Sequence, residues 1–300
     1  MNRVIMIFFV VAIIFAKGEI SFAEQFEYPN DHLLVSTDWV EEQMKTGDLF
    51  IIDVRAEGFE DGHIPTAAHL HMGELEDKTH PIQGFLVSER TFEEVMNRLG
   101  VRNEHTIVVY DDGKETSAAR LFYALEYYGH KDVRLLNGGY RAWRADQKDI
   151  TKLKVAKPRG QFDSTVQEEL MVHKDQVKLM IGKDGVILLD VRSPEEYNGT
   201  KVLAKRGGHI PTAVNVEWNQ VLNETNVPLF KSYRDISSIL QEAGVTKEKK
   251  IIVYCQKANR ASHMYFTLRL MGYPNISVYE GSWEEWGNDP NTPISNPTVK

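Results

Sequence analysis

Cys255 is the only cysteine in the chain. It stands where a strand-like run, residues 250–254, gives way to a short loop and then to a helical pattern. A thiol reacts as its thiolate, and nearby cations or the free N–H groups of a helix N-terminus favour that anion. We therefore predict that Cys255 is a catalytic nucleophile. The residues predicted to bind its anionic substrate are the loop residues Gln256, Lys257, Ala258, Asn259 and Arg260.

Two of these loop residues, Lys257 and Arg260, are cations at the start of the predicted helix. A cation there lies at the unfavourable end of the helix dipole, at a cost of a few tenths of a kcal/mol. This placement favours a bound anion beside Cys255. The alternative is that both side chains are ordinary solvated charges.

The chain also contains an internal repeat with a period of about 140 residues, which indicates a duplicated domain. Residues 49–55 answer to 186–192, residues 62–67 to 208–213, and residues 106–110 to 250–254; Trp143 answers to Trp286. Short apolar runs alternate with amphipathic ones in each half. This alternation predicts an α/β fold in which each half is a parallel β-sheet with helices on both faces. Cys255 would then lie at the carboxyl end of a strand, where such sheets bind their ligands.

Several elements have clear limits in the sequence. Buried strands are expected over residues 50–54, 107–110 and 133–136. Helices are expected over 40–45 after the cap candidates Thr37 and Asp38, over 92–99 after Ser88, over 118–128, from Ser232 to about Gly244, and over 261–271. The polar stretch of residues 146–167 has no sustained period and is predicted to link the two halves.

Comparison of the two halves separates residues of the fold from residues of the site. Asp190 and Arg192 recur as Asp53 and Arg55, so we interpret both pairs as structural ion pairs. His209 likewise recurs as His63 and is interpreted as a turn residue. At the position of Cys255, however, the first half has Asp111, which cannot act as a sulfur nucleophile. We therefore expect a non-catalytic first domain and a catalytic second domain.

The repeated Asp-Val-Arg and Gly-His-Ile-Pro-Thr-Ala segments, the strand that ends in cysteine, and residues 280–286 resemble the tandem-domain rhodaneses, which are thiosulfate sulfurtransferases. The resemblance covers residues 33–293, and the loop Cys-Gln-x-x-x-Arg is similar to that of a bacterial subgroup. It implies that Cys255 takes the outer sulfur of thiosulfate, releases sulfite, and passes the persulfide sulfur to cyanide or a thiol. It also implies that no metal or organic cofactor is needed.

The sequence departs from the family pattern near the substrate. The family's substrate-binding arginine, a few residues after Asp-x-Arg, is missing, and Glu195 and Glu196 stand there. The second half also has seventeen positions from Arg192 to His209, against eight from Arg55 to His63. This basic insertion contains Arg206, which we name as the replacement substrate cation. A solvated surface loop is the alternative.

Three other functions compete with thiosulfate sulfur transfer. Phosphatases of related shape use a Cys-x5-Arg loop, one residue longer than the Cys-x4-Arg spacing found here, so phosphoryl chemistry is disfavoured. A 3-mercaptopyruvate sulfurtransferase is closer. A non-enzymatic persulfide carrier or binding protein is also compatible with a lone reactive cysteine.

The N-terminus predicts the compartment and the partners. Arg3, the apolar residues 4–16 and a small-x-small site at residues 21–23 are typical of a cleaved signal peptide, so we expect an exported, periplasmic or secreted protein without stable membrane association. Removal of residues 1–23 would leave 33 basic and 42 acidic side chains of the original 35 and 43, a formal charge of −9. Such a surface disfavours nucleic acid as a partner.

We expect a monomer whose partners are a small anionic sulfur donor and a thiophilic acceptor. The chain is predicted to divide into a first domain (33–147), a linker (148–168) and a second domain (169–293).

Overall fold

The structure is a computed structural model that describes residues 28–47 and 49–297. The predicted signal peptide lies outside these residues. The first half forms a sheet from β1 (Leu34–Val35), β2 (Leu49–Asp53), β3 (Ala68–His69), β4 (Thr106–Tyr110) and β5 (Val133–Leu136). The second half forms a sheet from β6 (Met171–Val172), β7 (Val186–Asp190), β8 (Val214–Asn215), β9 (Lys250–Tyr254) and β10 (Ile276–Tyr279).

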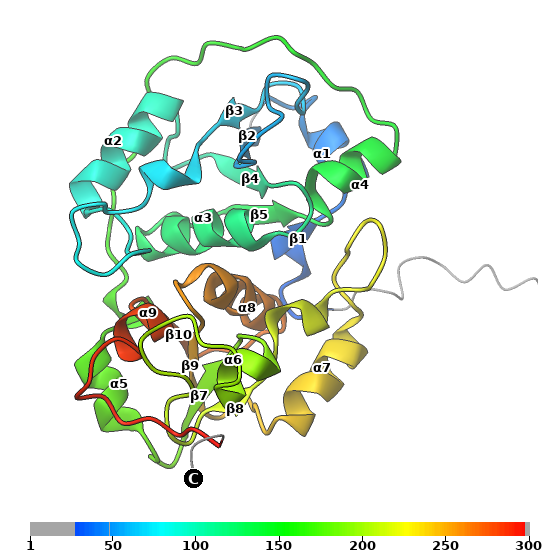
Figure 1. Cartoon of the computed structure of the whole chain (residues 1–300). Coiled ribbons are helices and arrows are strands. Elements are labelled where there is room, and N and C mark those ends of the chain that lie inside the picture. Colours follow the sequence, from blue (N-terminus) through cyan, green and yellow to red (C-terminus); the bar gives the residue numbers. More distant parts are fainter. Residues whose placement is uncertain (1–27, 48, 298–300) are drawn as a thin grey trace, which may run out of the picture.

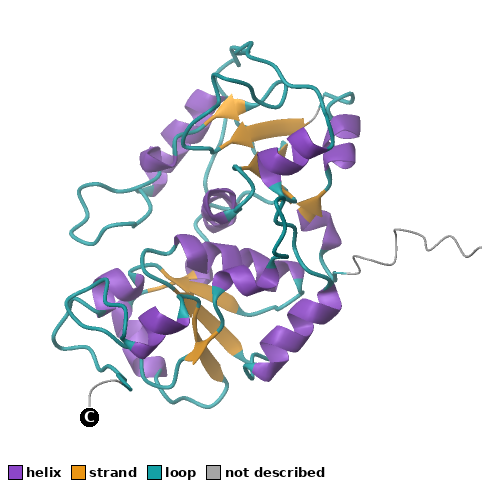
Figure 2. Cartoon of the chain, turned by 45° about the vertical axis from the view of Figure 1, so that its right-hand side comes forward, coloured by secondary structure: helices purple, strands orange, loops and turns teal. Residues whose placement is uncertain are grey.

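The two sheets have the same topology. Their orders are β1-β5-β4-β2-β3 and β6-β10-β9-β7-β8, and every strand pair in them is parallel. Helices lie on both faces of each sheet (Figures 1 and 2). The predicted α/β fold of two tandem domains is therefore confirmed.

The helices of the described residues fall into two sets, and the second set has one helix more than the first. The first domain has α1 (Thr37–Gln43), α2 (Glu89–Leu99), α3 (Thr116–Tyr127) and α4 (Gly139–Ala145), with 3-10 turns η2 (Asp31–Leu33) and η3 (Met72–Glu74). The second has α5 (Lys174–Met180), α6 (Pro194–Asn198), α7 (Tyr233–Glu242), α8 (Asn259–Leu270) and α9 (Ser282–Trp286), with η4 (Glu168–Leu170) and η5 (Trp218–Val221). None of the helices in this part of the chain has the length and apolar character needed to cross a bilayer.

Local chemistry explains where the helices begin. Ser88 and Ser232 cap α2 and α7 as predicted, because each hydroxyl accepts a backbone N–H of the first turn. The cap prediction for α1 is wrong: Ser36 is the N-cap, and Thr37 is already helical. The helices α3 and α8 begin two residues earlier than predicted. Each follows a residue in the left-handed conformation, Glu115 and Ala258, which turns the chain directly from the loop into the helix.

The two domains pack through α3 and α8, which lie between the two sheets (Figure 1). The rings of Phe122 and Phe266 meet edge to face with centroids 4.9 Å apart, and those of Tyr123 and Tyr265 at 5.2 Å. Buried side chains of both domains form one continuous apolar cluster around these helices. The first domain therefore packs directly against the helix that begins at the Cys255 loop.

The stretch predicted as a linker contains no helix or strand between Ala145 and Glu168. It arcs over the outside of the first domain (Figure 1), where Thr151 pairs with His63 and Gln161 with Arg102. Phe162 anchors it, because this side chain is buried in the apolar cluster.

Candidate active site

Cys255 follows β9, the central strand of the second sheet, and precedes α8. The residue is buried, with 1% of its surface exposed. Its backbone N–H donates to the Ser282 hydroxyl at 3.2 Å, and its carbonyl accepts the N–H of Trp283 at 2.9 Å. The start of α9 therefore holds the main chain on both sides of the thiol. The predicted position at a strand-to-helix turn agrees with this geometry.

The first domain shows what the same loop does with a negative charge. Asp111 follows β4 as Cys255 follows β9, and its carboxylate accepts four backbone N–H groups. These come from Gly113 at 2.8 Å, Glu115 at 2.8 Å, Ser117 at 3.1 Å and Ala118 at 3.3 Å. Burial raises the pKa of Asp111, while these N–H groups act in the opposite direction. The loop and the start of the helix thus form an anion site that Asp111 fills itself.

The second domain repeats this arrangement with a thiol in place of the carboxylate. Ala258 has φ 63° and Glu115 has φ 62°, so the two helices start alike. The second loop is one residue shorter, because its left-handed residue comes three positions after Cys255 and not four. By this match, the N–H groups of Ala258, Arg260 and Ala261 correspond to three of the four that bind the Asp111 carboxylate, those of Glu115, Ser117 and Ala118. Their dipoles favour an anion at the sulfur position.

Arg260 is held by a carboxylate from the insertion that is found only in the second half. Its two terminal nitrogens bind the two Glu196 oxygens at 2.7 and 2.9 Å. Burial lowers the pKa of Arg260, but Glu196 and the nearby Cys255 outweigh burial, and the pKa is raised. For Glu196, burial acts upward and Arg260 downward, and the pKa is lowered. Glu196 is itself fixed by a capping box with Ser193 at the start of α6.

Three other loop residues face different surroundings. Lys257 donates from Nζ to Oε1 of Gln83, a residue of the first domain, at 2.5 Å. Gln256 donates to Glu284 at 3.0 Å and to the Leu203 carbonyl at 3.3 Å, while its own Oε1 is buried without a partner in the described structure. Asn259 is exposed. The loop is therefore held from the first domain, from the insertion and from α9.

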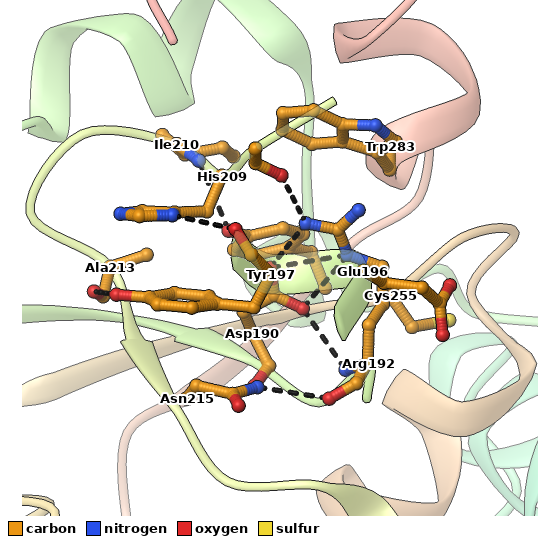
Figure 3. A network of polar contacts seen from close by, with 12 residues as sticks. Asp190, Arg192, Glu196, Tyr197, His209, Ile210, Ala213, Asn215, Cys255 and Trp283 are labelled. Atoms are coloured by element: carbon orange, nitrogen blue, oxygen red, sulfur yellow. Dashed lines mark hydrogen bonds and ion pairs between the residues drawn. The ribbon is translucent and has the colours of Figure 1, made fainter. Parts of the chain in front are cut away.

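The buried ion pair of Asp190 and Arg192 lies close to Cys255 (Figure 3). Arg192 binds Asp190 through Nε at 3.0 Å and through Nη2 at 2.6 Å, and it also donates to the Gly208 carbonyl at 2.8 Å. Its guanidinium lies 4.2 Å from the ring centre of Trp283, the residue whose N–H binds Cys255. Asp53 and Arg55 form the same pair in the first domain. The structural interpretation of both pairs is confirmed.

The two histidines of the repeat occupy equivalent turns. His209 bonds through Nδ1 to the Tyr197 carbonyl at 2.9 Å and stacks on the Tyr197 ring, as His63 does with Phe59. These contacts agree with their interpretation as turn residues. In the described ranges, no group of three or more His, Cys, Asp and Glu side chains is placed to hold a metal ion.

The comparison with protein families matches both halves of the chain. The model of the rhodanese-like domain fits residues 36–146 and again residues 173–289. The chain belongs to the rhodanese family. The relatives of this rhodanese include a sulfur carrier protein, TtuD, of Thermus thermophilus, which is 36% identical over 89% of this chain and 98% of its own length. The thiosulfate sulfurtransferase of Pseudomonas aeruginosa is 34% identical over 82% of this chain and 91% of its own.

Solved structures of similar fold include an ergothioneine biosynthesis enzyme. The anaerobic ergothioneine biosynthesis enzyme from Chlorobium limicola, in complex with trimethyl histidine, aligns with a TM-score of 0.79 and 25% identity over 89% of this chain and 70% of its own. A structure of EanB with ergothioneine covalently linked to a persulfide cysteine has a TM-score of 0.81 and 27% identity, covering 90% of this chain and 71% of its own.

The structure corrects the interpretation of Arg206 as the substrate cation of this rhodanese. Its guanidinium donates to main-chain carbonyls of the C-terminal segment, including those of Trp286 and Thr292 at 3.0 Å each and that of Asp289. These bonds engage both terminal nitrogens. Arg206 therefore holds the basic insertion against the segment that follows α9, and Arg260 is a cation near Cys255.

The sequence alone assigns no role to Glu196. It shows only that this residue stands where the family has its substrate-binding arginine. The pattern Ser193-Pro194-Glu195-Glu196 is a capping box, and it predicts a short helix that the first half lacks. That signal indicates a carboxylate held at a helix start, but only the structure places it beside Arg260.

Proposed function

We propose that this rhodanese is a thiosulfate sulfurtransferase that works through a persulfide on Cys255. The observation that carries the proposal is the Asp111 carboxylate in the equivalent loop of the first domain, which accepts four backbone N–H groups. The matching loop of the second domain starts its helix in the same way and carries a thiol at the position of the carboxylate, so its N–H groups suit a thiolate before the reaction and a persulfide anion after it.

The chemistry takes two displacements on sulfur. The Cys255 thiolate attacks the outer sulfur of thiosulfate, a new S–S bond forms, and the old S–S bond breaks with its electron pair leaving on sulfite. An acceptor, cyanide or a thiolate, then attacks the outer sulfur of the persulfide. That S–S bond breaks, the Cys255 thiolate returns, and thiocyanate or an acceptor persulfide is released. The loop N–H groups hold the anionic sulfur through both steps.

The charges around the loop support a small anionic donor. Arg260 and Lys257 supply positive charge, while Glu196 neutralises part of it. A mercaptopyruvate donor, with one carboxylate, is the alternative. The relative named as a thiosulfate sulfurtransferase supports the thiosulfate donor, and the relative named as a sulfur carrier supports a protein acceptor as the second candidate.

Purified protein tests the donor and the nucleophile together. With thiosulfate and cyanide we expect thiocyanate formation that disappears in Cys255→Ser. Mass spectrometry after thiosulfate alone should show a gain of about 32 Da, one sulfur, confined to Cys255. Faster turnover with mercaptopyruvate would reassign the donor. A persulfide that forms but passes only to another protein would favour the carrier function, and no sulfur uptake from either donor would overturn the proposal.

The proposal includes export of the protein, with residues 1–23 as a cleaved signal peptide. The support is the order of Arg3, the apolar residues 4–16 and the small residues before Glu24. N-terminal sequencing of the protein recovered from its native host tests this. A mature chain that starts at Glu24 is the expected result, and an intact Met1 in the cytoplasmic fraction would overturn it.

A further inference from the structure

One short segment of the first domain, residues 83–86, lies directly on the Cys255 loop, and we call it the strap. Gly84 makes the closest approach: a Cβ added to it would lie 3.0 Å from both Cβ and the carbonyl oxygen of Lys257. Gln83 accepts the Lys257 ammonium at 2.5 Å. At the other end of the strap, the N–H of Leu86 donates to Glu280 at 2.9 Å. The strap thus touches the loop and the residues that support it.

A buried ion pair between the domains fastens the strap. Arg120 of α3 binds both oxygens of Glu280, with Nη1 3.1 Å from Oε2 and a second, shorter bond from Nη2 to Oε1. Arg120 also donates from Nη2 to the Gly84 carbonyl at 2.8 Å. Both side chains of the pair are nearly inaccessible, with 4% and 0% exposed. Loss of either partner would leave the other as a buried, uncompensated charge.

The ion pair is also connected to the backbone of Cys255 through the residues that follow Glu280. Glu280 directly precedes Gly281 and Ser282, and the Ser282 hydroxyl accepts the N–H of Cys255. Arg120 approaches the hydroxyl of Ser262, in the first turns of α8, at 3.5 Å. Burial lowers the pKa of Arg120, but Glu280 outweighs it, and the charge of Cys255 also raises the pKa. Arg120 therefore lies within electrostatic reach of the reactive sulfur.

The loop has room to move if it is released. A cavity of about 280 Å³ lies between the domains, next to Lys257 and Asn259 on one side and Ser117 and Arg120 on the other. Cys255 itself is buried, with 1% of its surface exposed. The contacts of the strap are therefore placed to limit how far the loop opens into this cavity.

We propose that the strap and its anchor Arg120 make the first domain a positioning device for the sulfur-carrying loop of the second domain. Arg120 is a positioning residue, because it acts through Glu280 and Gly84 and not by touching the substrate. The catalytic consequence rests on the proposed function. The effect on the loop itself does not, since it concerns how the structure holds Cys255.

The test replaces Gly84 and a matched glycine. Gly84→Ala places a methyl group against Lys257, in a residue with φ +92°. Gly47→Ala in the same domain carries the same kind of backbone cost, with φ +86°, but its Cβ meets nothing within 4 Å. We measure the rate at which iodoacetamide alkylates Cys255, the kcat and KM of thiocyanate formation, and the thermal midpoint of each variant.

For Gly84→Ala we expect alkylation to become faster by about tenfold, because the loop opens more often. We expect kcat to fall by roughly ten- to a hundredfold, because a misplacement of about 1 Å has effects of that size, while KM for thiosulfate changes little. Gly47→Ala should match the wild type in alkylation and kcat, with a thermal midpoint close to that of Gly84→Ala. Equal alkylation rates and equal kcat in the two variants would overturn the proposal. A wild type without sulfur transfer would sink only the proposed function, since the alkylation comparison still tests the strap.

A second pair of variants tests Arg120 without emptying its site. Arg120→Lys keeps the charge beside Glu280 but replaces the planar fork that reaches two Glu280 oxygens and the Gly84 carbonyl. We expect faster alkylation and lower kcat than in the wild type. Combined with Gly84→Ala, the change in the logarithm of each rate should be smaller than the sum of the single changes, because both substitutions release the same strap. Additive effects would mean that the two residues act independently, and would contradict the proposal.

Discussion

At the scale of single residues, Cys255 and its counterpart Asp111 differ in the chemistry of their side chains. Both follow the central strand of their sheet and precede a helix. The Asp111 carboxylate accepts the N–H groups of its own loop, whereas Cys255 places a thiol at the matching position of the second loop. Under the proposed function, the same comparison explains why one half of the duplicated chain can keep the fold without taking part in the reaction. In the first domain, the buried Asp111 carboxylate accepts the N–H groups of the loop, and this loop contains no cysteine.

His263 is a residue whose burial gives a measurable pH dependence. It lies in α8 with 0% exposure, stacked on Phe230, and its Nε2 is 4.0 Å from the buried Glu115. Burial lowers the pKa of His263 to about 3 and raises that of Glu115 well above its usual value. His263 is therefore neutral in the folded protein near pH 5.

Because the unfolded chain protonates His263 below about pH 6.5, the stability that this residue contributes is present above that pH and is lost as the pH falls toward 3. Glu115 acts in the opposite direction, since its raised pKa stabilises the fold at low pH. We expect His263→Leu to lose less free energy of unfolding than the wild type between about pH 6.5 and about pH 5, by up to about 1.4 kcal/mol per pH unit. Urea unfolding at both pH values measures this. An equal loss in the two proteins would contradict the neutral, buried state of His263.

At the scale of elements, the turn between β10 and α9 supports the active-site loop. The Ser282 hydroxyl accepts the N–H of Cys255 at 3.2 Å and donates to the Tyr279 carbonyl at 2.9 Å. Gly139 occupies the equivalent place in the first domain. Its added Cβ would lie 2.6 Å from the Asp111 carbonyl oxygen, so the close packing of turn and loop belongs to both halves. Only in the second half does a hydroxyl hold the loop.

We predict that Ser282→Ala lowers the kcat of sulfur transfer by about tenfold, because the lost hydrogen bond lets the Cys255 main chain shift. The cost in free energy of unfolding should be about 1 kcal/mol. Ser277→Ala is the matched control. Ser277 lies in β10, is fully buried like Ser282, and donates to the Glu169 carbonyl at 2.6 Å. It should show a similar loss of stability with unchanged kcat. The prediction fails if both variants slow the reaction equally.

At the scale of the whole molecule, the α3–α8 interface joins both domains into one apolar cluster. Unfolding either domain would expose the buried face of the other, so the two domains should unfold together. The strap and the Arg120–Glu280 ion pair add polar contacts across the same interface. The domain without a cysteine is therefore part of the structure that surrounds Cys255.

We expect a single cooperative unfolding transition in urea, seen alike by circular dichroism and by Cys255 alkylation. Phe266→Ala should move that whole transition and lower the free energy of unfolding by about 3–5 kcal/mol, since Phe266 is fully buried and packs on Phe122. Two separate transitions, with only one of them shifted by the substitution, would show that the domains are independent.

The sequence by itself determined the fold of each half and the place of the lone cysteine at the end of a strand, because both depend on local patterns. Strand runs, serine caps and the position of Cys255 after β9 are written in consecutive residues, and the repeat provides a second copy that tests them. The same local reading failed for Arg206, since its partners at residues 286–292 are about eighty positions away.

Only the tertiary structure decided which groups surround the sulfur. Arg260 meets Glu196 across 64 positions, and Lys257 meets Gln83 across 174. A repeat predicts how each half folds but not how the halves face each other, because the packing of α3 on α8 depends on the shapes and charges of both surfaces at once. The loop of Cys255 is specified by the sequence, whereas its environment arises from the meeting of two domains.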